Sequence, residues 1–275
     1  KAVDRMHLAI LNNERILIYG DYDVDGTTSV AMMYDFLQKR TKNIEYYIPC
    51  RNNEGYGLSI KAINFAKQQK ISLIITLDCG IGAIKQIEYA NQIGLDIIIC
   101  DHHKPKEEIP KAIAILNPKQ KDCLYPYKEL SGCGVGFKLI QAYTLFMKEP
   151  FSSIKEYLDL LVVSIAADIV DVTGENRVLA FYGLKQINFA PRVGLKLLIK
   201  HLGKESDINM TDILFGIAPR INAAGRINHA NKAVEILKTK DSLQANQIVN
   251  EIEEHNKFRK EIEKKITKEA LGMID

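Results

Sequence analysis

The chain has 275 residues, of which 47% are hydrophobic and 26% charged, a composition typical of a soluble globular protein and not of a disordered or low-complexity chain. Its length suffices for one large domain or two ordinary ones, and its formal net charge of +3 permits a polyanionic partner without indicating one. Five cysteines without a CxxC pair, no signal peptide and no apolar run of membrane-spanning length favour a cytoplasmic protein with reduced thiols and no membrane partner.

The first part of the chain alternates short apolar segments with amphipathic ones. The pattern predicts strands over residues 16–19, 44–48, 72–77 and 96–100, and an edge strand over 112–116. It predicts helices over residues 1–13, 27–40, 59–69 and 83–93, and a polar loop over 50–57. This alternation indicates an α/β fold in which a parallel sheet is wound with helices.

Acidic groups follow three of the predicted strands. The segment 21–25, DYDVD, follows the first strand, Asp78 follows the third, and Asp101-His-His103 follows the fourth. Three carboxylates within five residues repel one another, so this segment is either a solvated acidic turn or a site for a hard divalent cation. Gly26 is expected to let the backbone turn sharply there. Because open α/β sheets place their active sites at the carboxyl ends of the strands, the three groups together favour a metal site.

The second part of the chain is predicted to be helical. We expect helices over residues 134–148, 154–170, 176–188, 193–202 and 230–238, and an arginine-bearing loop over 216–226. Within an apolar stretch, Asp168 and Asp171 are candidates for a further metal ligand, because a buried acid needs a partner. One long, highly charged helix is expected over residues 241–273, with an apolar stripe at Ile248, Ile252, Ile262 and Ile266.

Three parts of the chain follow from these patterns. Residues 1–200 form the expected catalytic domain, 201–240 a helical extension with the arginine loop, and 241–275 a long connector helix towards a further domain. The first residue is Lys1 and not Met, so we expect a fragment of a longer protein.

The acidic motifs carry a resemblance to a known family. Residues 21–26 (DYDVDG), 77–80 (LDCG) and 101–103 (DHH) resemble the motifs of the DHH phosphoesterase superfamily. Residues 51–57 (RNNEGYG), 167–168 (AD) and 219–226 (PRINAAGR) are similar to those of its RecJ branch, in the same order. The resemblance implies a metal-dependent exonuclease that hydrolyses single-stranded DNA from the 5′ end in repair and recombination. It also implies a following DHH-associated domain and an oligonucleotide-binding fold.

The resemblance further implies a two-metal site. Asp78 would bridge two divalent cations, with Mn²⁺ favoured and Mg²⁺ as the alternative, which agrees with the mixed carboxylate and imidazole ligands. Asp21 and His103 would act beside Asp78 in catalysis, Asp21 by orienting a ligand or water and His103 by contacting the scissile phosphate or fixing a ligand. The expected metal ligands are Asp23, Asp25, Asp78, His102 and Asp168; the resemblance alone favours Asp168 over Asp171.

Substrate contacts are expected from residues 51–57 and 219–226. The arginines of these two segments could instead pair with nearby acids, Arg51 with Glu54 in particular. Alternative functions are a phosphodiesterase acting on cyclic dinucleotides or very short oligonucleotides, and a catalytically silent scaffold. Single-stranded DNA is the expected partner, with a single-strand-binding protein and a helicase as further candidates. The expected substrate-binding residues are Arg51, Tyr56, Arg220, Asn222 and Arg226.

Overall fold

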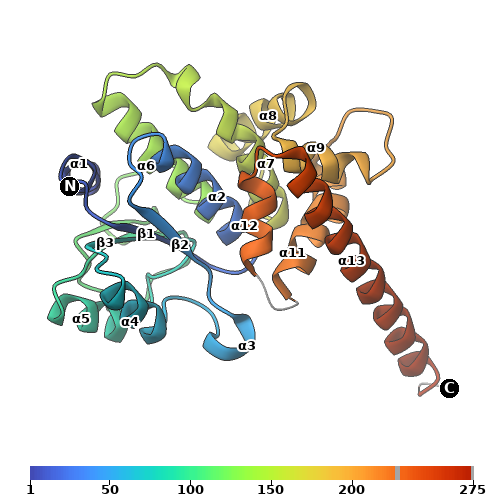
Figure 1. The fold of residues 1–275 in the computed structure, drawn as a ribbon, viewed down its shortest axis with the longest axis horizontal. Coiled ribbons are helices and arrows are strands. Elements are labelled where there is room, and N and C mark those ends of the chain that lie inside the picture. The colour runs from blue at the N-terminus through green and yellow to red at the C-terminus, as the bar shows by residue number, and fades with distance from the viewer. Residues whose placement is uncertain (227–229, 274–275) are drawn as a thin grey trace.

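The computed structural model describes residues 1–226 and 230–273, and within them lies a sheet of five parallel strands in the order β2-β1-β3-β4-β5 (Figure 1). The two central strands, β1 and β3, are buried along their whole length, as expected of apolar strands covered on both faces. The α/β class and the parallel sheet predicted from the sequence are confirmed. The strands are β1 (Ile16–Gly20), β2 (Ile44–Tyr47), β3 (Leu73–Leu77), β4 (Asp96–Cys100) and β5 (Ala114–Leu116).

Helices cover both faces of this sheet. In Figure 1, α4 and α5 lie below it, and α2 and α6 lie above it. Successive residues of β1 divide between the two layers: Ile16 and Ile18 pack in the core with α2 and α6, whereas Leu17 and Tyr19 pack with α4 and α5. The helices of this part are α1 (Ala2–Leu11), α2 (Val24–Gln38), α3 (Arg51–Glu54), α4 (Ile60–Gln68), α5 (Ile84–Gln92) and α6 (Gly132–Phe146).

A helical part follows the sheet and shares its core. The larger hydrophobic core has members from Met6 to Ile252, so the sheet layer and the later helices are packed together. None of the described helices is both long and apolar enough to cross a membrane. The helical elements are η1 (Phe151–Ser153), η2 (Lys155–Tyr157), α7 (Leu158–Ala167), α8 (Gly174–Phe189), α9 (Val193–Lys200), α10 (Met210–Asp212), the π-helical η3 (Ile213–Ile217), α11 (Ala218–Arg226), α12 (Ala230–Lys238) and α13 (Ser242–Leu271).

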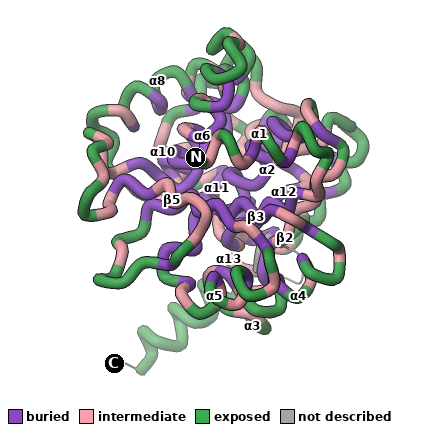
Figure 2. Tube along the Cα trace, turned by 90° about the vertical axis from the view of Figure 1, so that its left-hand side faces the viewer, coloured by how far each residue is buried: buried purple, intermediate pink, exposed green. Residues whose placement is uncertain are grey.

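The long helix α13 extends away from the rest of the molecule (Figures 1 and 2). Its first half packs against α9 and α11 and buries Ile248 and Ile252. The long helix predicted over residues 241–273 is present, but its apolar stripe is buried only in the first half, since Ile262 and Ile266 are 41% and 59% exposed. The stripe continues in the sequence because the helical period continues, but no other described element lies against the outer turns.

Some element boundaries differ from the prediction. Residues 216–226 are helical and not a loop, because Pro219 lies in the first turn of α11, directly after the widened turn η3, where a missing N–H costs little. The helix expected over 154–170 begins with the 3₁₀ turn η2 and ends at Ala167, since Ile169 has a left-handed φ of 57°.

Candidate metal centre

The acidic segment after β1 begins helix α2 and does not form a separate loop. Asp23 is the N-cap, and the Gly26 N–H donates to Asp23 Oδ1 at 2.9 Å. Helix α2 therefore begins at Val24, three residues earlier than predicted, and Asp25 lies in its first turn. The sharp turn expected at Gly26 is also wrong: this position needs glycine because a Cβ there would lie 2.3 Å from the Asp21 carbonyl oxygen.

Asp25 is buried and held by groups from two distant helices. Gly132 N–H donates to Asp25 Oδ2 at 2.6 Å and Cys133 N–H donates to Asp25 Oδ1 at 2.8 Å, both from the first turn of α6. The Ser164 hydroxyl of α7 donates to Asp25 Oδ1 at 2.6 Å. The positive end of the α6 dipole also favours the carboxylate. Sequence reasoning missed these residues, although Ser131 was a recognisable N-cap for a helix beginning at Gly132.

His102 brings three of the acids together. Its Nε2 lies 3.2 Å from Asp78 Oδ1, 3.6 Å from Asp168 Oδ2 and 3.7 Å from Asp25 Oδ2. Three overlapping groups each offer ligand atoms within 4.8 Å of one another, and Asp78 belongs to two of them. These groups are Asp21, Asp23 and Asp78; Asp25, His102 and Asp168; and Asp78, His102 and His103.

The two alternative acids at the end of α7 are clearly separated. Asp168 is the C-cap of α7 and lies in the cluster with Asp25 and His102. Asp171 is exposed, and its carbonyl oxygen accepts hydrogen bonds from Tyr127 and Asn176. The geometry therefore favours Asp168 as the ligand and assigns Asp171 to loop structure.

The cluster concentrates negative charge in a buried place. Burial, followed by repulsion from Asp25 and Asp23, raises the pKa of Asp78 well above its ordinary value. Burial and the neighbouring acids likewise raise the pKa of Asp21 and that of Asp168 to about 7. Asp21 Oδ1, Asp78 Oδ1 and both ring nitrogens of His102 lack a hydrogen-bond partner among the described residues. Buried oxygen and nitrogen atoms without hydrogen-bond partners are suitable ligands for one or more divalent cations.

His103 has a different environment from His102. Burial lowers the pKa of His102, whereas His103 Nδ1 lies 2.7 Å from Asp101 Oδ1, and this hydrogen bond raises the pKa of His103. Burial opposes ionisation of Asp101, but its hydrogen bonds with His103 and the Ile81 N–H hold its pKa below the ordinary value. Asp101, which was expected at this edge of the sheet but without a role of its own, therefore favours the cationic form of His103 beside the cluster.

The segment after β2 adds an aromatic ring and an arginine to this edge. The Tyr56 hydroxyl donates to the Asp78 carbonyl oxygen at 3.1 Å and lies 3.1 Å from His103 Nδ1. Arg51 begins α3, is exposed, and has its Cζ 5.3 Å from the centre of the Tyr22 ring. The alternative Arg51–Glu54 ion pair does not form among the described residues; the Glu54 carboxylate instead accepts from Tyr47, Ser59 and the Cys50 N–H.

The residues expected in the arginine loop are placed differently. The Arg220 guanidinium pairs with Glu253 of α13 and donates to the Gly216 carbonyl oxygen at 2.8 Å. These contacts fasten α11 to α13. Asn222 is half-buried on α11. Arg226 is outside the residues whose side chains the structure describes. The structure thus brings Tyr56 to the acidic cluster and engages Arg220 with another helix.

Comparison with known proteins agrees with this geometry. Residues 15–165 match the DHH family, N-terminal domain. The chain is 44% identical over 276 residues to the single-stranded-DNA-specific exonuclease RecJ of Bacillus subtilis, covering 100% of this chain and 34% of the relative. It is 34% identical over 289 residues to the Escherichia coli protein of that name, covering 100% of this chain and 50% of the relative. A crystal structure of exonuclease RecJ bound to manganese superposes with a TM-score of 0.90 at 32% identity, over 99% of this chain and 69% of that one. The chain thus spans between a third and half of the length of these curated relatives.

Proposed function

Because this chain belongs to the DHH family, and within it to the RecJ branch, we propose that it is a metal-dependent exonuclease degrading single-stranded DNA from the 5′ end. The observation that carries the proposal is the convergence of Asp25, Asp78, His102 and Asp168 at the carboxyl edge of the sheet. A role in DNA repair and recombination in the cytoplasm, alongside a single-strand-binding protein and a helicase, belongs to the same proposal.

Two divalent cations suit the donor set. Asp78 and His102 each take part in two of the three ligand groups, and of these two Asp78 would be the bridge because its carboxylate has two oxygens to offer. Carboxylate and imidazole donors suit Mn²⁺, with Mg²⁺ as the alternative. When bound, the ions supply activation of a water and stabilisation of the leaving oxygen. The residues that would hold them are Asp23, Asp25, Asp78, His102 and Asp168.

His103 and Asp21 have roles in phosphate binding and in proton transfer. His103, whose cationic form Asp101 favours, donates a hydrogen bond to an oxygen of the scissile phosphate. Asp21 accepts a proton from the attacking water at its unpartnered Oδ1. The water oxygen bonds to phosphorus, the P–O3′ bond breaks, and O3′ takes a proton from solvent. The products are a nucleoside monophosphate and a strand shortened by one unit.

A single strand suits this site better than a duplex. The cluster is buried, with Asp25 and Asp78 almost inaccessible, so one backbone must enter it alone. Duplex DNA has a persistence length of about 50 nm and cannot bend one strand into such a site without unpairing. A single strand is flexible and can stack a base on an exposed ring such as that of Tyr56.

Arg51 is the proposed contact for the terminal 5′ phosphate. It lies at the end of β2, beside the strand that leads into Asp23 and Asp25, and its guanidinium is free of Glu54. A guanidinium can grip a phosphate with two parallel hydrogen bonds. Asn222 and Arg226 are kept as further candidate contacts. Arg220 is a weaker candidate because binding DNA would compete with its pairing to Glu253.

Digestion of end-labelled DNA tests the proposal directly. We expect release of mononucleotides from a 5′-phosphorylated single strand with Mn²⁺, less with Mg²⁺ and none with a chelator, and little release from a blunt duplex. Equal rates on the two DNAs would refute single-strand specificity. Cleavage of a cyclic dinucleotide in preference to the oligonucleotide would favour the phosphodiesterase alternative.

A further inference from the structure

A cavity of about 290 Å³ opens beside the acidic cluster. Tyr56, Asp101 and His103 form the wall nearest to the cluster, and the turn 80–83 that follows β3 forms another. Tyr56, which lines the cavity, contacts the Asp78 carbonyl oxygen through its hydroxyl. The cavity is therefore continuous with the place where we expect the scissile phosphate.

The lining of this cavity suits an anionic ligand with a planar ring. Lys104 and Lys106 lie at its rim, and neither forms an ion pair within the described residues. Tyr56 is 54% exposed and its ring lies at 74° to the His103 ring, so the two rings are not stacked on each other and the exposed part of the tyrosine ring is available to a stacking partner. Gln86 lines the cavity as a half-buried amide that can donate and accept.

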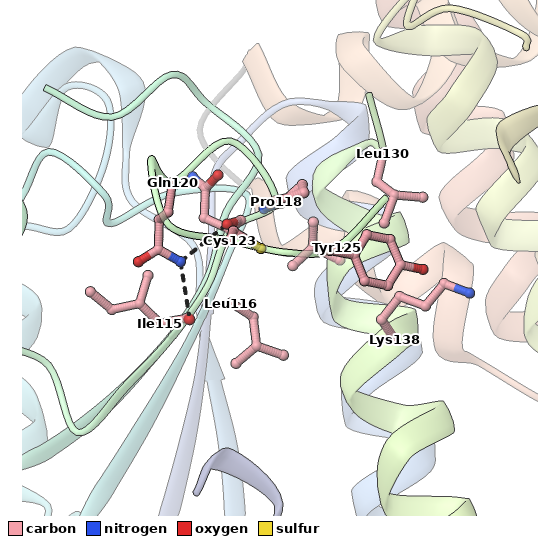
Figure 3. Close-up of a pocket in the computed structure, with 10 residues that line it drawn as sticks. Ile115, Leu116, Pro118, Gln120, Cys123, Tyr125, Leu130 and Lys138 are labelled. Carbon is pink, nitrogen blue, oxygen red and sulfur yellow. Dashed lines mark hydrogen bonds between the residues drawn. The ribbon is translucent and has the colours of Figure 1, made fainter. Parts of the chain in front are cut away.

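A second cavity provides a contrast. It measures about 240 Å³ and lies between the connection after β5 and helix α6 (Figure 3). Its walls are largely apolar, with Leu116, Leu130 and Val135 among them, and its cation, Lys138, is paired with Glu175. The apolar walls and the paired lysine make this cavity a poor site for a nucleotide. The cavity at Tyr56 instead combines an aromatic ring with two lysines that form no ion pair within the described residues.

The size of the cavity at Tyr56 limits what can enter it. Ligand pockets range from about 300 to 1,000 Å³, so this one has room for about one nucleoside and not for a length of chain. The buried residues Leu58, Ile81 and Ala83 form part of its lining. A cavity of this size holds one unit of the strand, so we place the terminal unit in it.

On the basis of the exonuclease function proposed above, we propose that this cavity is the subsite for the terminal nucleotide, whose base and sugar enter it before cleavage releases that unit. Tyr56 stacks on the base, and the two rim lysines attract the anionic nucleotide. Contacts with a base through its ring face and one amide discriminate little among the four bases. The subsite thus accounts for release of one nucleotide at a time without sequence preference.

Gly82 offers a way to fill the cavity without touching the metal ligands. It lines the cavity, a Cβ there meets no atom within 4 Å, and its φ lies outside the left-handed region. Gly82→Phe therefore occupies the space where the base would lie, and Gly82→Ala is the matched control. Both variants should unfold at the temperature of the wild-type chain, which thermal denaturation checks.

The test compares two 5′-phosphorylated oligonucleotides that differ only in the terminal unit, thymidine or an abasic sugar. For the wild-type chain and Gly82→Ala we expect kcat/KM about tenfold higher on the thymidine end, as one stacked base allows. Gly82→Phe should lose this advantage while retaining its rate on the abasic end. Competition binding of both oligonucleotides in chelator gives a second readout that needs no cleavage.

The outcomes separate the two proposals. If Gly82→Phe keeps the preference for the thymidine end in both cleavage and binding, the cavity is not the nucleotide subsite and this proposal is overturned. If the wild-type chain cleaves neither oligonucleotide, the exonuclease function fails, and binding in chelator alone decides the subsite. Equal loss of binding to both ends in Gly82→Phe, at an unchanged melting temperature, would also overturn the assignment, because filling the cavity would then not act through the terminal base.

Discussion

Removing the Ser164 hydroxyl tests how the cluster is held. In Ser164→Ala, Asp25 Oδ1 loses a hydrogen bond of 2.6 Å and keeps the Cys133 N–H, while Oδ2 keeps the Gly132 N–H. The Ser131 hydroxyl, 2.6 Å from the Ser164 oxygen, loses the same partner. The carboxylate therefore has more freedom to rotate away from the position in which it faces His102.

The size of the effect follows from the charge on Asp25. A hydrogen bond to a charged group contributes about 1.5–3 kcal/mol, and loss of a group that orients a metal ligand weakens metal affinity about 10- to 100-fold. We expect the Kd for Mn²⁺, measured by isothermal titration calorimetry without DNA, to rise by that factor. The free energy of unfolding in chelator should fall by about 1.5–3 kcal/mol.

Thr144→Val is the matched control. Thr144 is also a buried hydroxyl, which donates to the Ile140 carbonyl oxygen within α6 at 2.9 Å. This variant should lose stability to a similar or smaller degree without changing Mn²⁺ affinity. Unchanged Mn²⁺ affinity in Ser164→Ala would refute the idea that the hydroxyl positions Asp25 for the ion.

Other expected outcomes concern the buried carboxyls of the site, the pH dependence of stability and recognition of the 5′ end of the DNA. Asp78→Asn should abolish cleavage yet raise the melting temperature in chelator, because it removes a carboxyl whose ionisation is opposed in the folded chain by burial and by the neighbouring acids. The folded pKa of Asp21 and Asp168, about 7, exceeds the ordinary 3.8. Between pH 3.8 and about 7, these carboxyls are therefore protonated in the folded chain and ionised in the unfolded chain. Their contribution to the free energy of unfolding, measured in urea with chelator, should be full below pH 4 and fall as the pH rises to 7. Arg51→Ala should lose most of the preference for 5′-phosphate over 5′-hydroxyl ends, assayed at constant salt, and keep Mn²⁺ affinity.

Each of these expectations has a contrary result. Near-normal cleavage by Asp78→Asn would exclude a bridging role for that carboxylate. Stability in chelator that rises between pH 4 and 7 would mean that other acids, with lowered pKa values, dominate the titration. An unchanged ratio of rates on the two 5′ ends in Arg51→Ala would move terminal recognition to another group. Lys42→Ala, at an exposed lysine that belongs to none of the motifs, serves as the charge-matched control for Arg51.

The sheet and the position of the acids were predictable because local patterns determine them. Ile16 to Tyr19 and Leu73 to Leu77 are short apolar runs bounded by polar residues, and a parallel sheet brings their carboxyl ends to one edge whatever the details of packing. The approach of Asp78 to His102 therefore required no knowledge of side-chain geometry. The resemblance to a family added the choice of Asp168 over Asp171, which periodicity could not make.

Contacts between distant helices were not predictable from the sequence. Ser164 forms a hydrogen bond with Asp25 only because α7 packs beside α2. Glu253 forms an ion pair with Arg220 only because α13 packs against α11. Neither pair has a signal in spacing, since each joins residues far apart in the chain. Pro219 was misleading for a related reason: proline usually ends a helix, and the widened turn before it is a property of the packed structure.

The half-anchored helix α13 has a consequence for local opening. Its first turns are fixed by buried side chains such as Val249 and Ile252, whereas residues 261–271 are exposed on every side. An isolated helical segment of that length is marginal in water, and a surface pair such as Arg259 with Glu263 adds only a few tenths of a kcal/mol. Amide protons should therefore exchange with deuterium in a gradient along the helix. The slowest would lie near Val249, and those beyond Glu263 would exchange by fraying without global unfolding.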